Sequence, residues 1–116
     1  MTTPPPIRLI LVEDQPKIMQ QQRRLLEAYD ELELVGAARD GAGALALINK
    51  EAPDVVLLDL GLPDMDGVDV IRQLRKQGNK VEILIYTIFD EEERVLEAVR
   101  AGASGQAVLA AAMALA

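Results

Sequence analysis

Cysteine and histidine are both absent from this chain of 116 residues. Without cysteine there can be no disulfide, thiolate metal site or cysteine nucleophile, and this absence fits a reducing compartment. Without histidine, a Ser-His-Asp triad and a histidine metal site are excluded. The sequence also lacks an apolar run of the length that a membrane span or a signal peptide needs. Because the net charge is −7, we do not expect this segment to contact nucleic acid.

Length and composition predict one small, soluble domain in the cytoplasm. The chain is long enough to bury a hydrophobic core without help from a disulfide or a metal. Half of the residues are hydrophobic and 27% are charged, which is typical of a globular protein. The proline-rich start, "MTTPPP", predicts a disordered tail over residues 1–6. The folded domain is therefore expected over residues 7–116.

Strand-like and helix-like segments alternate along the chain. Apolar segments predict strands at 7–13, 31–38, 54–60, 80–88 and 105–109. Helices are predicted at 14–29, 43–52, 69–78 and 90–102, the first of them capped by Asp14. The expected buried face of the first helix carries Ile18, Leu25, Leu26 and Tyr29, with the polar Gln22 as an interruption. Strands that are apolar on both faces and alternate with helices predict a doubly wound α/β fold around a parallel sheet.

Polar residues stand at the predicted carboxyl ends of the strands, where parallel sheets place their binding sites. Glu13 and Asp14 follow the first strand, Asp59 lies at the end of the third, and Thr87 lies at the end of the fourth. Three carboxylates brought together would repel one another, and a hard cation such as Mg²⁺ removes that repulsion.

A carboxylate beside such a cation can attack phosphorus and form an aspartyl-phosphate. We therefore predict that Asp59 is the nucleophile and that Thr87 supplies a hydroxyl group. The predicted metal ligands are Asp59 itself, Glu13, Asp14 and the backbone carbonyl of Gly61. The cofactor that follows from this donor set is Mg²⁺.

Four segments, in this order and spacing, resemble the receiver domain of bacterial two-component response regulators. They are "LVED" (11–14), "PDVVLLDLGLPDMDGVDVI" (53–71), "ILIYT" (83–87) and "AVRAGASG" (98–105). The sequences "LPDMDG" and "AGASG" are most similar to the subgroup joined to a LuxR/NarL-type helix-turn-helix domain. The resemblance implies a flavodoxin-like fold with a five-stranded parallel sheet in the order 2-1-3-4-5, whose last helix is here short or incomplete.

The resemblance also implies a signalling function rather than enzymatic turnover. In the family, the acid that matches Asp59 receives phosphate from a sensor histidine kinase or a phosphotransfer protein. The residue that matches Thr87 then moves toward the phosphoryl group, and the surface of the fourth strand, fourth helix and fifth strand changes. The implied partners are the phosphodonor, a C-terminal helix-turn-helix domain that controls transcription, and a second copy in a homodimer, with no membrane. Ile18 and Met19 are candidates for a kinase-docking surface, although helix packing explains Ile18 equally well.

The end of the chain departs from the family pattern. Leu109 occupies the position of the family lysine that pairs with the phosphoryl group, and Gln106 occupies that of the switch aromatic. Residues 101–116 contain no charged side chain, and "AVLAAAMALA" (107–116) is low in complexity. Two interpretations stay open. The chain is either an atypical receiver that has lost part of its switch and works without phosphorylation, or its end is altered or truncated relative to the natural sequence.

Two other functions fit parts of the same sequence. The stretch "GAGALA" (41–46) matches the G-x-G-x-x-A pattern of a dinucleotide-binding turn, with Asp59 at the distance of a ribose-binding acid. Residues 38–40 separate this stretch from its strand, so its glycines are better interpreted as a turn into the second helix. A phosphatase of the haloacid dehalogenase type would need an acid two residues after Asp59, where this chain has Gly61.

Overall fold

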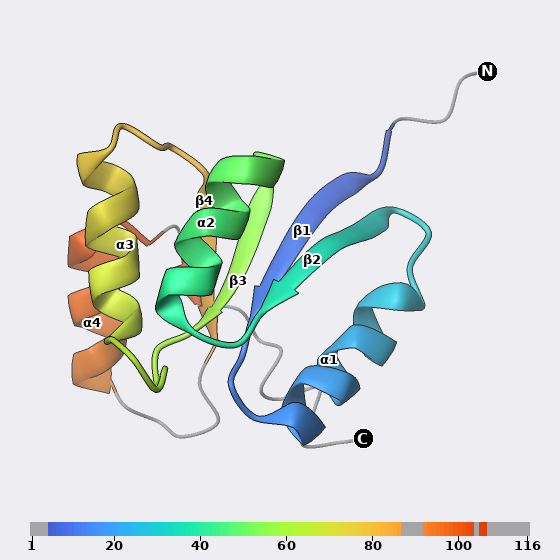
Figure 1. Ribbon diagram of the computed structural model, residues 1–116, viewed down its shortest axis with the longest axis horizontal. Helices are drawn as coiled ribbons and strands as arrows, with labels where there is room; N and C mark the ends of the chain where they lie inside the picture. The colour runs from blue at the N-terminus through green and yellow to red at the C-terminus, as the bar shows by residue number, and fades with distance from the viewer. Residues whose placement is uncertain (1–4, 87–91, 104, 107–116) are drawn as a thin grey trace.

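The computed structural model describes residues 5–86, 92–103 and 105–106, and Figure 1 shows the arrangement of its elements. The strands are β1 (Ile7–Val12), β2 (Leu32–Ala38), β3 (Val55–Asp59), β4 (Glu82–Tyr86) and β5 (Gly105–Gln106). The helices are α1 (Pro16–Glu27), α2 (Gly41–Glu51), α3 (Gly67–Lys76) and α4 (Glu92–Ala101). None of these described helices combines the length and the apolar character that crossing a membrane requires.

The strands form one parallel sheet in the order β2-β1-β3-β4-β5. The α/β fold around a parallel sheet, predicted from alternating apolar and helical segments, is confirmed. β5 has two described residues, which pair with Leu84 and Ile85 of β4. The remainder of the predicted fifth strand and the short last helix, at 107–116, lie outside the described residues.

The side chains of the strands alternate between two core layers, one on each face of the sheet. On one face, Leu9 and Leu11 of β1 and Leu57 of β3 cluster with Leu26 of α1. On the other face, alternate residues of β1, β3 and β4 cluster with buried residues of α2, α3 and α4, which are Ala44, Ile48, Val68, Val70, Ile71, Leu74 and Ala98. Helices therefore cover both faces, which explains why the strands are apolar on both sides.

Three helices begin differently from the sequence prediction. α1 follows Gln15, whose side chain makes no capping hydrogen bond, so the prediction that Asp14 caps this helix is wrong. The proline at the start of α1, Pro16, has no N–H group and so reduces the need for a cap. α2 and α3 each begin two residues earlier than predicted, because the side chains of Asp40 and Asp66 cap them.

The buried face of α1 also differs from the prediction. Gln22, expected as a polar interruption, is fully buried, and its amide has no hydrogen-bond partner among the described residues. Tyr29 is 58% exposed because the helix ends before it. Leu26 is buried, while Ile18 and Leu25 are half-buried. The apolar contact of α1 with the sheet is therefore narrower than the sequence suggested.

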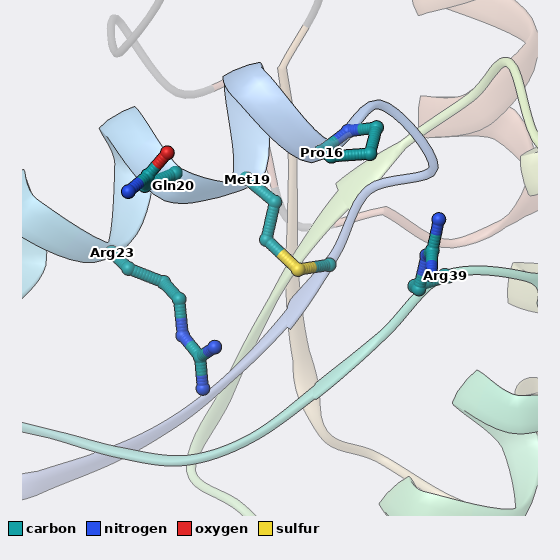
Figure 2. A pocket seen from close by; sticks show the side chains of 5 residues that line it. All are labelled: Pro16, Met19, Gln20, Arg23 and Arg39. Carbon is teal, nitrogen blue, oxygen red and sulfur yellow. The ribbon is translucent and has the colours of Figure 1, made fainter.

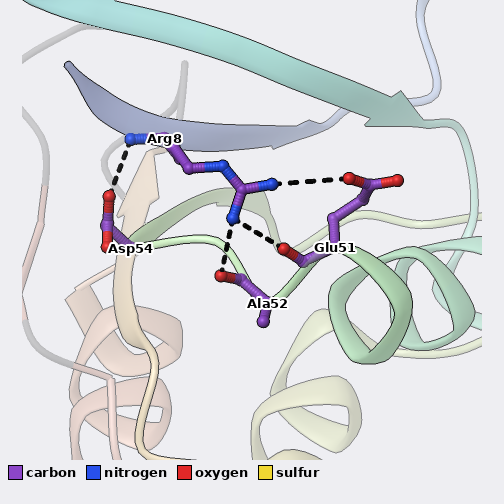
Figure 3. Close-up of polar contacts among 4 residues, drawn as sticks. All are labelled: Arg8, Glu51, Ala52 and Asp54. Carbon is purple, nitrogen blue, oxygen red and sulfur yellow. Dashed lines mark hydrogen bonds and ion pairs between the residues drawn. The ribbon is translucent and has the colours of Figure 1, made fainter. Parts of the chain in front are cut away.

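Arg8 joins three elements at the amino-terminal edge of the sheet (Figure 3). Its guanidinium group donates to the carbonyl oxygens of Glu51 (2.8 Å) and Ala52 (3.1 Å), where α2 ends. The same group lies 3.4 Å from the Glu51 carboxylate. The backbone N–H of Arg8 donates to Oδ2 of Asp54 at 2.8 Å, just before β3. These contacts connect β1, the end of α2 and the start of β3 at the edge of the sheet opposite the carboxyl ends of the strands.

Candidate functional site

Three carboxylates meet at the carboxyl ends of β1 and β3. Asp59 is the last residue of β3, and Glu13 and Asp14 directly follow β1. The two strands are parallel neighbours with Val12 opposite Leu58, so their ends reach the same edge of the sheet. One carboxylate oxygen from each acid lies within 4.8 Å of the other two. In Figure 1 this edge lies where the arrows of β1 and β3 end.

The surroundings of this acidic cluster disfavour the charge on Asp59. Glu13 is 1% exposed and accepts a hydrogen bond from the Gln15 N–H at 3.0 Å, while Asp14 and Asp59 are half-buried. The pKa of Asp59 is raised from its ordinary value, chiefly because burial penalises the charged form. The negative charge of Asp14 raises it further, and hydrogen bonds, first that from the backbone of Gly61, reduce the shift.

This donor set fits a hard divalent cation. Mg²⁺ binds oxygen ligands, commonly one or two carboxylates together with waters and phosphate oxygens. A cation here would also offset the electrostatic cost that raises the pKa of Asp59. Glu13, Asp14 and Asp59 therefore fit the predicted Mg²⁺, whereas the usual zinc ligands cysteine and histidine are missing from the sequence.

After Asp59 the chain turns back sharply, and backbone contacts close the turn. The N–H of Gly61 donates to Oδ1 of Asp59 at 3.2 Å. The N–H of Gly67 donates to the carbonyl of Leu60 at 2.9 Å, and Gly61 forms an isolated antiparallel bridge with Asp66. The loop thereby keeps the backbone of Gly61 beside the Asp59 side chain, which a metal-binding role of the Gly61 carbonyl requires.

Asp64, in the same loop, is a residue that the sequence analysis missed. Its carboxylate accepts the N–H of Gly41 at 2.7 Å and that of Ala42 at 3.0 Å, at the start of α2. These two hydrogen bonds lower the pKa of Asp64. No local pattern links this acid to a helix start more than twenty positions earlier in the chain.

The same contacts decide against the dinucleotide-binding alternative for 41–46. That function would need the free N–H groups at the start of α2 to bind a pyrophosphate. The N–H groups of Gly41 and Ala42 are instead bonded to Asp64, and that of Gly43 to Oδ1 of Asp40 at 2.6 Å. The glycines open a helix, as the turn interpretation expected.

A groove lies between the start of α1 and the chain just after β2. It is lined by Pro16, Met19, Gln20, Arg23 and Arg39 and has a volume of about 350 Å³. Figure 2 shows Met19 between the two arginines, with Arg23 to one side and Arg39 to the other. Neither arginine forms an ion pair with any part of the chain that the structure describes.

The three predicted switch positions lie at the limits of the described chain. Thr87 and Leu109 fall outside the described residues. Gln106 is the second residue of β5, where it is paired with Ile85 of β4. Their roles in switching stay predictions.

The fold and the site together consist of a parallel sheet covered by helices, with an acidic cluster at the carboxyl ends of its strands. This combination is typical of receiver domains. The chain belongs to the response regulator receiver domain family, whose pattern matches residues 9–108. The nitrate/nitrite response regulator protein NarP of Escherichia coli is 38% identical over 100 residues, which cover 86% of this chain and 46% of NarP. The uncharacterized transcriptional regulatory protein YxjL of Bacillus subtilis is 35% identical over 99 residues, or 85% of this chain and 45% of YxjL.

The chain spans less than half the length of these curated relatives. A third relative has the name of an enzyme, the protein-glutamate methylesterase/protein-glutamine glutaminase of a Nocardioides strain. It is 38% identical over 102 residues, which cover 86% of this chain and 28% of that protein. The receiver part is therefore what these differently named proteins share with this chain.

Solved structures agree with this family assignment. The receiver domain of the putative response regulator NarL from Mycobacterium tuberculosis has a TM-score of 0.84 and 35% identity, covering 89% of this chain and 83% of that one. A LuxR-family response regulator from Aurantimonas has a TM-score of 0.82 and 35% identity, covering 87% of this chain and 72% of that one. The resemblance to the LuxR/NarL-type subgroup is confirmed.

Proposed function

We propose that this chain is a phosphoacceptor module that receives a phosphoryl group on Asp59 from a sensor histidine kinase or a phosphotransfer protein. The observation that carries the proposal is the convergence of Glu13, Asp14 and Asp59 within 4.8 Å, in a chain of the receiver family. The module acts in the cytoplasm as a signalling component rather than as a turnover enzyme.

In this mechanism Asp59 is the nucleophile. Glu13, Asp14, Asp59 and the carbonyl of Gly61 would hold Mg²⁺, and the ion would supply positive charge to offset that of the phosphoryl group. A carboxylate oxygen of Asp59 forms a bond to phosphorus while the bond from phosphorus to the donor nitrogen or oxygen breaks, and that donor atom keeps the electron pair. The Gly61 N–H, which donates to Oδ1 of Asp59, orients the carboxylate for this attack.

The phosphoryl group would then act on a two-state surface. It adds roughly −1.5 to −2 charges, and this charge biases the surface of β4, α4 and β5 through Thr87. Leu109 in place of the family lysine removes one cation that would meet the new charge. A charge-assisted hydrogen bond is worth roughly 1.5–3 kcal/mol, which is comparable to typical couplings between sites. This substitution favours one alternative, a receiver whose surface responds weakly to phosphorylation or works without it.

The exposed side of α4 suggests where an output partner would bind. Leu96 and Val99 are 54% and 46% exposed and lie three residues apart, on one face of the helix. We assign this face to contact with an output domain of the helix-turn-helix type that controls transcription, or with a second copy of the chain. Both partners would cover apolar side chains that now face solvent.

We assign the groove beside α1 to the phosphodonor. Arg23 and Arg39, which have no ion-pair partner among the described residues, place positive charge on a chain whose net charge is −7, so the groove favours an acidic surface. Met19, between them, offers a deformable apolar contact. Of the two docking candidates, Met19 lines the groove, whereas the half-buried Ile18 does not line it.

Acetyl phosphate tests the phosphoacceptor proposal without a kinase. With Mg²⁺, we expect the intact mass of the chain to increase by one phosphoryl group, and peptide mapping to place that group on Asp59. Without Mg²⁺ the labelling should be much slower, because the repulsion among the acids is then not neutralised. Labelling that is independent of Mg²⁺, or that occurs at another residue, would contradict the proposal.

Charge reversal tests the docking assignment. Arg23→Glu is expected to slow phosphorylation by a sensor kinase that labels the wild type, because acidic residues of the kinase would then be repelled. Labelling by acetyl phosphate should not change, because this small donor needs no docking surface. An exposed arginine elsewhere, Arg72, provides the matched control as Arg72→Glu. Equal slowing by both substitutions would count against the groove.

A further inference from the structure

We propose that Asp64 is a positioning residue, which holds the metal-binding loop against the start of α2 and thereby sets the affinity of the site for Mg²⁺. This inference rests on the proposed function, since it takes the Gly61 carbonyl as a metal ligand. Asp64 itself is not one of the acids that converge at the site. It acts on the metal through the loop that follows Asp59.

The geometry ties the loop at two places. At its base, Gly61 and Asp66 form the antiparallel bridge, which brings the two ends of the loop together. At its tip, the Asp64 carboxylate accepts two N–H groups at 2.7 and 3.0 Å from the start of α2. A charged acceptor at a helix amino terminus is favourable, and each hydrogen bond to a charged group is stronger than a neutral one.

The loop and the helix are also in close contact beside these hydrogen bonds. A Cβ atom on Gly41 would collide with the side chain of Met65, with the Met65 sulfur at 2.7 Å. The loop can therefore pack this closely against the start of α2 only because residue 41 has no side chain. α2 has its own cap, because Asp40 accepts the N–H of Gly43 at 2.6 Å. The bonds from Asp64 are therefore additional to that cap, and their loss should act mainly on the loop.

If the contacts of Asp64 were lost, motion of the loop tip would also shift the Gly61 carbonyl, the proposed metal ligand in this loop. Gly61 lies three residues before Asp64 and is the one predicted ligand that belongs to this loop. Mutation of groups that orient metal ligands typically costs roughly 10- to 100-fold in metal affinity. Because only one of the predicted ligands depends on Asp64, we expect the lower end of that range, about tenfold.

Asp64→Ala and Asp64→Asn test the inference together. Both variants lose the same charge, but asparagine keeps an oxygen that can accept one of the two N–H groups. We expect the Mg²⁺ concentration at half-saturation, measured by titration of backbone amide NMR signals, to rise about tenfold in Asp64→Ala and clearly less in Asp64→Asn. The labelling rate with acetyl phosphate at saturating Mg²⁺ should change less than twofold in either variant.

Two controls separate positioning from stability. Asp54→Ala removes an aspartate that accepts the Arg8 N–H at 2.8 Å at the opposite edge of the sheet, with the same loss of charge. Asp40→Ala removes the cap of α2 itself but leaves the loop contact. Both controls are expected to bind Mg²⁺ as the wild type does.

Three results would overturn the inference. If Asp64→Ala reaches half-saturation at the same Mg²⁺ concentration as the wild type, the contact of Asp64 with α2 is only structural. If Asp64→Asn and Asp64→Ala weaken Mg²⁺ binding equally, the effect is one of charge alone. The same conclusion follows if Asp54→Ala weakens Mg²⁺ binding as much as Asp64→Ala does. A wild type that binds no Mg²⁺ and takes up no phosphoryl group would instead refute the proposed function, and the inference would fall with it.

Discussion

Asp59→Asn is expected to abolish phosphoryl uptake and to make the metal-free fold more stable near neutral pH. Burial, and then the charge of Asp14, raise the pKa of Asp59 in the fold above its ordinary value. A group of this kind stabilises the fold below its unfolded pKa, and this contribution is lost as the pH rises through its folded pKa. Above its folded pKa, the ionised Asp59 therefore destabilises the metal-free protein, and asparagine removes that cost.

The gain should be on the order of 1 kcal/mol, the scale of typical single substitutions. Urea unfolding of both proteins in metal-free buffer, at several pH values from neutral to acidic, measures it. The difference should shrink as the pH falls, because the wild-type Asp59 then becomes protonated in the fold. A difference that grows toward acidic pH would contradict the assignment of the raised pKa to Asp59.

With Mg²⁺ present, we expect the wild type to be more stable than Asp59→Asn, the reverse of their order without metal. A ligand at 100 times its dissociation constant stabilises a fold by about 2.7 kcal/mol, and only the wild type keeps all of the acids that fit the ion. Asp54→Asn, at the other edge of the sheet, is the matched control and should gain as much from Mg²⁺ as the wild type. An equal gain in Asp59→Asn would remove Asp59 from the metal site.

The parts of the site that could be predicted are those fixed by topology. Alternating strands and helices imply a parallel sheet, and in a parallel sheet neighbouring strands end at the same edge. This reasoning alone brings Glu13, Asp14 and Asp59 together, and the structure has them within 4.8 Å. The strand residues could also be identified, because burial on both faces leaves an apolar run with few polar side chains.

Other parts could not be predicted because they depend on contacts between distant residues. The contact of Asp64 with Gly41 and Ala42 depends on how the loop after β3 packs against α2, which no local pattern encodes. Gln22 is polar and lies on a helix, so its complete burial follows only from the packing of α1. The sequence allowed Asp14 to act as a helix cap, as a metal ligand or as both. In the structure the N-cap position of α1 is Gln15, so Asp14 is not the cap.

Gly67→Ala is expected to be strongly destabilising, although it adds one methyl group. A Cβ atom at this position would lie 2.7 Å from Cα of Leu60 and 2.8 Å from the carbonyl oxygen of Asp59. Both are backbone atoms, one in the last residue of β3 and one in the residue that follows it, so neither can rotate away as a side chain would. Either α3 must move off the sheet or the end of β3, with Asp59, must shift. Overpacking of this kind costs typically about 1–3 kcal/mol, and with rigid backbone on one side we expect the upper end.

Gly78→Ala, just beyond the other end of α3, is the matched control. Gly78 has a φ of +80°, and an added Cβ there would meet nothing within 4 Å, so its cost is only that of the left-handed conformation, roughly 1–2 kcal/mol. Both variants should lose stability in urea, but only Gly67→Ala should also label slowly with acetyl phosphate under conditions where it is folded. Its added methyl is expected to displace Asp59, the proposed phosphoacceptor, whereas Gly78 lies beyond the far end of the helix. Normal labelling of folded Gly67→Ala would mean that α3 yields and that the position of Asp59 does not depend on this contact.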